Sequence, residues 1–264
     1  MTPRTRTPLA AFGLALAAGA LALGGAPLLA QKQPAPRQDL ARPDSAFGSG
    51  TARGQWQARV TRTERGHLIG NPKADGRMIE FVSYTCPHCA NFTSEGEPGL
   101  DLTLIAPGKM SLEVRPVIRN PLDLAVTLLA GCGDPAGFKD RHRRLMLSQG
   151  EWLEKARQAP RSQLEVWFRG DANARMNAAS ALGLIDMLAK PALPRTALNA
   201  CLMDDKAAER LLANSDADRA EFAFPGTPSF ALDGKLIADV SDWKGLYPVL
   251  SARFAAGPVA KGAQ

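Results

Sequence analysis

The chain has 264 residues, of which 45% are hydrophobic and 22% are charged, and this is the balance of a globular protein with material for a large core. The formal net charge of +6 is spread along the chain. One short basic cluster, Lys139, Arg141, Arg143 and Arg144, has no aromatic residues interleaved with it, so we interpret it as a solvated helix face and exclude nucleic acid as a partner.

Residues 1–30 have the layout of a secretory signal peptide. Arg4 and Arg6 precede an uncharged stretch of Leu, Ala and Gly that ends before a polar segment. Leu28 stands where a cleavage site usually has a smaller residue, so an uncleaved membrane anchor is the alternative. Both interpretations predict export to the periplasm, an oxidising compartment in which the four cysteines would form two disulfide-capable pairs.

Residues 31–54 are rich in Pro, Gln, Arg, Ser and Gly and have no continuous apolar period, which predicts a flexible linker. Beyond this linker, strands are predicted at residues 58–63, 78–82 and 111–118, with a turn at Gly70-Asn71-Pro72. The strand at residues 78–82 is mostly apolar, as in a central strand covered on both faces. It leads directly towards Cys86.

Helical periodicity dominates the segment that follows. Asn120 and Pro121 are typical of a helix start, and the apolar stripe that follows them stops at Gly131. Asp134-Pro135 starts a second helix. Further helices are predicted at about residues 163–168, 172–190, 195–202 and 205–222.

Strand character returns at residues 229–232, a hairpin turn follows at Asp233-Gly234, and a last helix begins after Asp242. We therefore predict an α/β fold in which residues 55–120 and 223–258 form one domain. Residues 121–222 form an inserted all-helical domain in this prediction.

Cys86-Pro87-His88-Cys89 is the motif that carries chemistry. Two cysteines separated by two residues, after an apolar strand and at the start of a predicted helix, are typical of a dithiol/disulfide exchange site. At a helix N-terminus the Cys86 sulfur would face unpaired backbone N–H groups and the positive end of the helix dipole, which favour its thiolate. His88 would stabilise this anion further, and Pro87 removes a competing donor and fixes φ. We predict that Cys86 is the nucleophile and that Cys89 is the less exposed, resolving thiol.

Other uses of this cysteine pair fit the sequence less well. A zinc site would need a second such pair or a His-x-x-x-His segment, and the sequence has neither. A c-type haem would need His directly after Cys89, where Ala90 stands. A static disulfide across two residues would be strained. We expect no metal and no cofactor, and the non-enzymatic alternative is a module that binds soft metals through Cys86, Cys89 and His88.

Two segments of the chain, read together, resemble a known family. They are Glu80-Phe81-Val82-Ser83-Tyr84-Thr85-Cys86-Pro87-His88-Cys89 and, much later, Gly226-Thr227-Pro228-Ser229-Phe230. Their order and separation are similar to those of the DsbA family of exported thiol:disulfide oxidoreductases. The resemblance spans about residues 57 to 256 and implies a thioredoxin-like fold with an inserted all-helical domain.

The resemblance also implies roles for residues outside the cysteine pair. Pro228 would follow a cis peptide bond and lie against the redox-active sulfurs, and the backbone of Thr227 would pair with a bound substrate chain. Glu80 would be a buried acid that assists proton transfer at Cys89. Arg115, on the next predicted strand, is the candidate for the buried cationic partner that the family usually supplies as lysine.

Cys132 and Cys201 both fall in the predicted helical insertion. Unpaired thiols in an exported protein would be a liability beside an oxidising site, so we predict a structural disulfide between these two residues. A second redox pair is the alternative, although neither cysteine has the helix-start or proline context that activates a sulfur.

The sequence therefore predicts an exported oxidase that donates the Cys86–Cys89 disulfide to reduced, unfolded or newly exported proteins. A quinone-linked membrane partner would reoxidise it. A disulfide isomerase or reductase of the same fold is the alternative. Such an enzyme would need a dimerisation element, and residues 31–54 offer no helical zipper, so we expect a monomer.

Overall fold

The computed structural model describes residues 55–255, so the signal peptide predicted at residues 1–30 and the linker predicted at residues 31–54 lie outside the described residues. The described strands form one mixed sheet with the order β1-β2-β4-β3-β5-β6. They are β1 (Val60–Arg62), β2 (His67–Gly70), β3 (Gly76–Val82), β4 (Met110–Pro116), β5 (Ser229–Leu232) and β6 (Lys235–Leu236).

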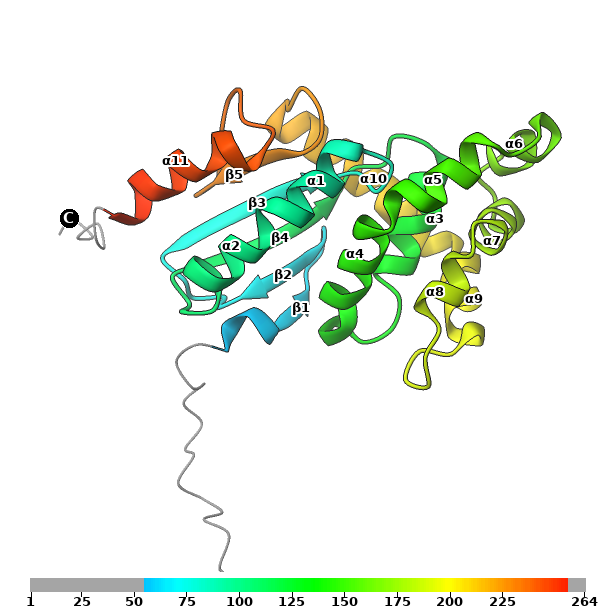
Figure 1. Ribbon diagram of the computed structural model, residues 1–264, viewed down its shortest axis with the longest axis horizontal. Coiled ribbons are helices and arrows are strands. Elements are labelled where there is room, and N and C mark those ends of the chain that lie inside the picture. The colour runs from blue at the N-terminus through cyan, green and yellow to red at the C-terminus, as the bar shows by residue number, and fades with distance from the viewer. Residues whose placement is uncertain (1–54, 256–264) are drawn as a thin grey trace, which may run out of the picture. The chain divides into compact units, whose positions relative to one another are not determined.

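β3 lies in the middle of this sheet and ends just before the segment that carries the cysteine pair (Figure 1). It pairs in parallel with β4 and antiparallel with β5. Because successive side chains of a strand point to opposite faces, Met78 and Val82 pack on one side of the sheet and Phe81 packs on the other. The apolar run is thus a central strand covered on both faces, as the sequence predicts.

Helices cover the face of Met78 and Val82, and Figure 1 shows α1 and α2 in front of the sheet. These helices are α1 (Pro87–Glu95), α2 (Glu97–Leu100), a π-helical turn at Asp101–Ile105, and the C-terminal helix α11 (Trp243–Ala255). On the opposite face, the ring of Phe81 stacks on that of Phe224, with centroids 4.5 Å apart.

The segment between β4 and β5 is built of helices joined by turns, and Figure 1 shows α3 to α9 gathered beyond one end of the sheet. The helices are α3 (Pro121–Ala130), α4 (Phe138–Leu147), α5 (Gln149–Arg157), α6 (Arg161–Trp167), α7 (Ala172–Ala181), α8 (Leu184–Leu188), α9 (Arg195–Met203) and α10 (Asp205–Phe222). The predicted cap of α3 is confirmed, because the Asn120 side-chain oxygen accepts the backbone N–H of Asp123 at 3.0 Å. One hydrophobic cluster runs from Phe92 of α1 to Leu129 of α3 and Leu198 of α9, so the helices share a core with the sheet.

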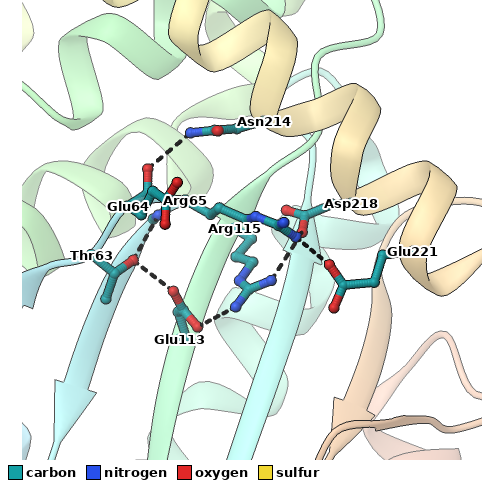
Figure 2. Close-up of polar contacts among 9 residues, drawn as sticks. Thr63, Glu64, Arg65, Glu113, Arg115, Asn214, Asp218 and Glu221 are labelled. Carbon is teal, nitrogen blue, oxygen red and sulfur yellow. Dashed lines mark hydrogen bonds and ion pairs between the residues drawn. The ribbon is translucent and has the colours of Figure 1, made fainter.

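An ion-pair network joins α10 to the sheet on the face that Phe81 occupies (Figure 2). Asp218 of α10 has a side chain that is 1% exposed, and its Oδ1 accepts from Arg65 at 2.8 Å and from Arg115 at 2.9 Å. Arg115 also pairs with Glu113 of the same strand at 2.8 Å. The long helix that returns the chain to β5 is therefore fixed to two separate parts of the sheet region.

Two elements near the start of the described chain differ from the prediction. The sequence predicts one strand at residues 58–63, whereas the chain forms a 3-10 turn at Trp56–Ala58 and then β1. β2 is not predicted at all. Its four residues are too few to show alternation, and they form a strand because β1 and β4 pair with them on both sides.

The helical segment also differs in detail. α5 is absent from the prediction, and the single helix predicted at residues 172–190 is divided into α7 and α8 at Gly183, whose φ of +75° ends a right-handed helix. The basic cluster on α4 is not uniformly solvated, because Arg141 is 3% exposed and donates to the carbonyl oxygen of Ala130 at 2.8 Å. None of the helices within residues 55–255 combines the length and the apolar character needed to span a bilayer.

Candidate active site

Cys86 lies at the N-cap of α1, directly after β3 and a three-residue loop. Its backbone is extended, with φ −96° and ψ 116°, and Pro87 is the first residue of the helix. The backbone N–H of Cys89 donates to the carbonyl oxygen of Cys86 at 3.1 Å, which closes the first turn. The predicted helix start at the cysteine pair is confirmed, and its unpaired N–H groups lie at the Cys86 sulfur.

The Cys86 side chain is buried against the Thr227–Pro228 segment. The residue is 3% exposed, and its thiol donates to the carbonyl oxygen of Thr227 over 3.0 Å. The peptide bond between Thr227 and Pro228 is cis. The fold therefore brings the two sequence motifs together at one sulfur.

The environment of Cys86 favours its thiolate. A hydrogen bond from the Cys89 thiol is the largest cause that lowers the pKa of Cys86 from 9.0 to about 4. Hydrogen bonds from the backbone N–H groups of Cys89 and His88 act in the same direction, whereas burial opposes them. These donors stabilise the charged sulfur more than burial disfavours it. Cys86 is therefore the more acidic of the two thiols.

His88 and Pro87 both have exposed side chains. His88 reaches the Cys86 sulfur through its backbone N–H, which is one of the smaller contributions that lower the pKa of the thiol. The prediction assigned this effect to the imidazole ring, whereas the structure shows it for the backbone N–H of His88. A ring at the first turn of a helix can point to solvent while its backbone N–H points back to the cap.

Cys89 is fully buried one turn into the helix. Burial raises the pKa of its thiol well above the usual range, and the hydrogen bond and the charge of Cys86 add to this effect. A backbone hydrogen bond with Ser83 lowers the pKa of this thiol, whereas the charge of Glu80 raises it. The Cys89 thiol therefore keeps its proton at neutral pH, as the predicted resolving thiol would.

Glu80 is fully buried on β3, on the same face as Met78 and Val82. Neither of its carboxylate oxygens has a hydrogen-bond partner among the described residues. Burial raises the pKa of this carboxyl well above its usual range, and the nearby charge of Glu97 raises it further. A protonated acid at this position can supply or take up the proton of Cys89.

Arg115 is not the partner of Glu80, which corrects the prediction from the family resemblance. Arg115 is in register with Phe81, so its side chain lies on the opposite face of the sheet from Glu80. There it pairs with Asp218 and Glu113 (Figure 2).

Sequence reasoning missed the two residues that hold the loop before Cys86. Asp123 of α3 accepts the backbone N–H of Thr85 at 2.8 Å, and the Gln149 side-chain amide donates to the carbonyl oxygen of Cys86 at 3.0 Å. The position of Asp123 in the first turn of a capped helix is visible in the sequence. This position predicts a role at the helix end and does not predict contact with a distant loop. No local pattern marks Gln149.

A buried polar chain behind the loop was also missed. The imidazole of His142 lies between the Tyr84 hydroxyl, 3.0 Å from Nδ1, and Glu97, 2.8 Å from Nε2. The Thr93 hydroxyl, one turn after Cys89 on α1, donates to Glu97 at 3.0 Å. These residues come from separate elements, so no spacing in the sequence reveals them.

Cys132 and Cys201, which the sequence predicts to pair, are joined by a disulfide, whereas Cys86 and Cys89 are free thiols. The disulfide links the end of α3 to α9, within the helical insertion. Within the part of the chain that the structure describes, no group of three or more His, Cys, Asp or Glu side chains is placed to hold a metal ion.

Comparison with known proteins places this geometry in a family. The sequence profile of the thioredoxin family matches residues 62–252. The solved structure of a protein-disulfide isomerase from Novosphingobium aromaticivorans is 38% identical, with a TM-score of 0.68, and the match covers 72% of this chain and 97% of that one. The structure of Wolbachia pipientis alpha-DsbA1 is 21% identical, with a TM-score of 0.53, and the match covers 72% and 90% of the two chains.

Curated sequences give a similar result. A Rickettsia felis protein, named provisionally as a protein-disulfide oxidoreductase, is 30% identical over 170 residues, which are 63% of this chain and 52% of the relative. The chain thus spans about half the length of the curated relatives that it matches. With a family profile that matches nearly all of the described residues, and a thioredoxin-like sheet that presents Cys86 at the start of α1, the chain belongs to the thioredoxin family and has the fold of its DsbA-like members.

Proposed function

We propose that this chain is a protein-disulfide oxidoreductase whose redox centre is Cys86 and Cys89. The observation that carries the proposal is the contrast between the two sulfurs, because the pKa of Cys86 is lowered to about 4 and that of Cys89 is raised. Dithiol exchange needs this contrast, since one sulfur must leave readily and the other must resolve the mixed disulfide.

The exchange can be written with these two sulfurs alone. In the oxidised protein, a client thiolate attacks the Cys86 sulfur, forms a client–Cys86 disulfide and releases Cys89 as a thiolate. This thiolate then takes up a proton from the Glu80 carboxyl group. A second client thiolate then attacks the client sulfur of this mixed disulfide, and Cys86 leaves as a thiolate. The client loses two electrons and gains a disulfide, and the protein keeps both electrons as its dithiol. Thr227 and Pro228 would hold the client backbone beside the sulfur.

The proposed direction is disulfide donation. Stabilising the Cys86 thiolate stabilises the reduced protein, so the oxidised protein tends to give its disulfide away. Isomerisation is the second candidate, and it is favoured by the similarity to the Novosphingobium protein, which is named a protein-disulfide isomerase. Equilibration with glutathione tests the direction: a reduction potential of about −120 mV supports donation, one of about −180 mV supports isomerisation, and one of about −270 mV contradicts donation.

The proposed site of action is the periplasm, where the protein would act as a monomer on reduced, newly exported proteins and be reoxidised by a quinone-linked membrane partner. The layout of residues 1–30 supports this part of the proposal. Fractionation of cells that produce the full chain tests it. Recovery in the periplasm is the expected result, and retention in the cytoplasm would refute it.

Trapping of clients tests the exchange itself. Cys89→Ser removes the resolving thiol, so Cys86 should accumulate mixed disulfides with client proteins that disappear on reduction. The matched control Cys86→Ser keeps the buried thiol and should trap none. If the Cys89→Ser variant traps nothing and the wild-type protein instead binds a soft metal stoichiometrically, the chain is a metal-binding module and the proposal is wrong.

A further inference from the structure

A buried carboxylate from the helical insertion holds the loop that precedes Cys86. Asp123, in the first turn of α3, is fully buried. Its Oδ1 accepts the backbone N–H of Thr85 at 2.8 Å and the hydroxyl of Ser83 at 2.9 Å, and its Oδ2 accepts the backbone N–H of Arg119 at 3.0 Å. The carboxylate thus fixes the residue that is covalently bonded to Cys86.

Asn120, the cap of the same helix, holds the other side of Thr85. Its side-chain amide donates to the Thr85 hydroxyl at 3.0 Å, while its oxygen accepts the backbone N–H of Asp123. Both the backbone and the side chain of Thr85 are therefore bonded to the start of α3. This number of bonds exceeds what one helix end needs for its own capping.

A second insertion helix holds the loop from another direction. Gln149, the first residue of α5, is 3% exposed. Its side-chain Nε2 donates to the carbonyl oxygen of Tyr84 at 2.7 Å and to that of Cys86 at 3.0 Å. The same Cys86 oxygen accepts the backbone N–H groups of Cys89 and Ala90, at 3.1 and 3.3 Å.

The position of the loop matters because the Cys86 sulfur depends on several hydrogen bonds at once. The Cys89 thiol and the backbone N–H groups of the first helical turn donate to this sulfur and favour its thiolate, and the Thr227 carbonyl, 3.0 Å away, accepts from the neutral thiol. Hydrogen bonds weaken steeply with length and angle, so a small displacement of the loop weakens all of them together.

We propose that Asp123 is a positioning residue for the redox centre, through which the helical insertion fixes the loop at residues 83–85 and sets the place of the Cys86 sulfur. The inference rests on the proposed function only in naming Cys86 as the reacting sulfur. It assigns to the insertion a chemical effect on the thiol in addition to a structural one.

The variant Asp123→Asn separates positioning from charge. Its amide has nearly the same shape but offers one oxygen in place of two, so one of the donors loses its acceptor. Removing a negative charge would by itself favour the Cys86 thiolate and lower its pKa. Loss of positioning has the opposite sign, and we expect the pKa of Cys86 to rise by about one unit, which is about a tenfold loss of thiolate relative to thiol at a given pH. Thiolate absorbance of the reduced protein measures this without any client.

Asp218→Asn is the matched control. Asp218 is an equally buried aspartate that joins a helix of the same segment to the sheet region, but its partners are Arg65 and Arg115 (Figure 2). Within the described residues, none of its hydrogen bonds reaches the loop at residues 83–85. This variant should lower the free energy of unfolding and leave the pKa of Cys86 unchanged. If the pKa of Cys86 rises by the same amount in both variants, the role of Asp123 is only structural and the proposal is wrong.

Gln149→Leu tests the same idea without any change of charge, and it decides the matter if Asp123→Asn does not fold. We expect Gln149→Leu to raise the pKa of Cys86, as Asp123→Asn does. The oxidised variant should also be a weaker oxidant of glutathione, by about the factor by which its thiolate fraction falls. An unchanged or lower pKa in the folded variants refutes the positioning role. A wild-type protein that titrates as expected but transfers no disulfide would refute the proposed function alone, so the two failures are distinguishable.

Discussion

Cys86 and Cys89 are identical side chains whose positions give them opposite acidities. Cys86 stands at the cap of α1, where backbone N–H groups and the Cys89 thiol donate to it, and Cys89 lies one turn inside, where it has been removed from water. The helix therefore gives the two sulfurs of one short motif the different acidities that the proposed leaving group and resolving thiol need. No charged side chain is required for this difference.

The stability of the reduced protein should depend on pH through Cys86. Its pKa in the fold is about 4, below the ordinary value of 9.0, so between these values the unfolded chain binds more protons than the folded one. The contribution to stability is complete above pH 9, falls as the pH drops through this window and is lost below about pH 4. Urea unfolding of the reduced wild-type protein against Cys86→Ser measures it. The difference between the two should grow with pH, and a constant difference would contradict the prediction.

Glu80 should destabilise the fold at neutral pH. The pKa of Glu80 is higher in the folded chain than in the unfolded chain, so the unfolded chain loses this proton at a lower pH. The free energy of unfolding therefore decreases as the pH rises above the ordinary pKa of a carboxyl group. Glu80→Gln should increase the free energy of unfolding at pH 7, because the neutral amide has no proton to take up when the chain folds. The gain should shrink towards pH 4, and denaturant titrations at both pH values test this. The same variant should slow the release of Cys89 in disulfide exchange.

At the level of elements, periodicity predicted the long helices and the central strand, and local pairing decided the rest. β3 and α10 are long enough for their patterns to be read. β2 has four residues, and its conformation depends on strands far along the chain. α5 is as long as the predicted α9, and it was missed although Trp152 packs into the shared core. Gly183 lies inside a helical pattern, where its positive φ divides the helix although its sequence context does not show this.

The disulfide between α3 and α9 should act on stability and not on redox chemistry. It closes a loop with a sequence separation of 69. Replacing Cys132 and Cys201 with Ser should lower the free energy of unfolding by about 4 kcal/mol on chain-entropy grounds, measured by denaturant unfolding of oxidised protein. Thiolate absorbance of Cys86 should not change. If mild reductant frees four thiols instead of two, the bond belongs to a second redox pair.

For the molecule as a whole, the sequence predicted the groups that react but not the groups that place them. Cys86 and Cys89 belong to a local motif, and Thr227 was assigned through the family resemblance, so all three could be predicted without a structure. Asp123 and Gln149 act on the loop over 38 and 63 residues of chain, and only the fold brings them to it. Arg115 was predicted beside Glu80 because it lies on a neighbouring strand, but strand register put it on the other face.

The network around Asp218 joins distant parts of the chain, since its bond to Arg65 spans 153 residues (Figure 2). Asp218→Asn should cost about 3 kcal/mol of unfolding free energy, because it leaves two arginines with a lost partner in a largely buried site. Glu221→Gln in the same network removes a carboxylate that is 52% exposed and should cost less than about 1 kcal/mol. Equal costs in urea unfolding would show that burial does not decide the energy of this network.

The bond between Cys86 and Thr227 spans 141 residues, so the surroundings of this sulfur are completed late in synthesis. A nascent chain emerges with Cys86 long before Thr227, so the early chain carries Cys86 without its contacts to Thr227. The Cys132–Cys201 bond can form in the interval, because both of its cysteines also precede Thr227. The order of the chain thus leaves the contact between the two motifs to be made after the Cys132–Cys201 bond can form.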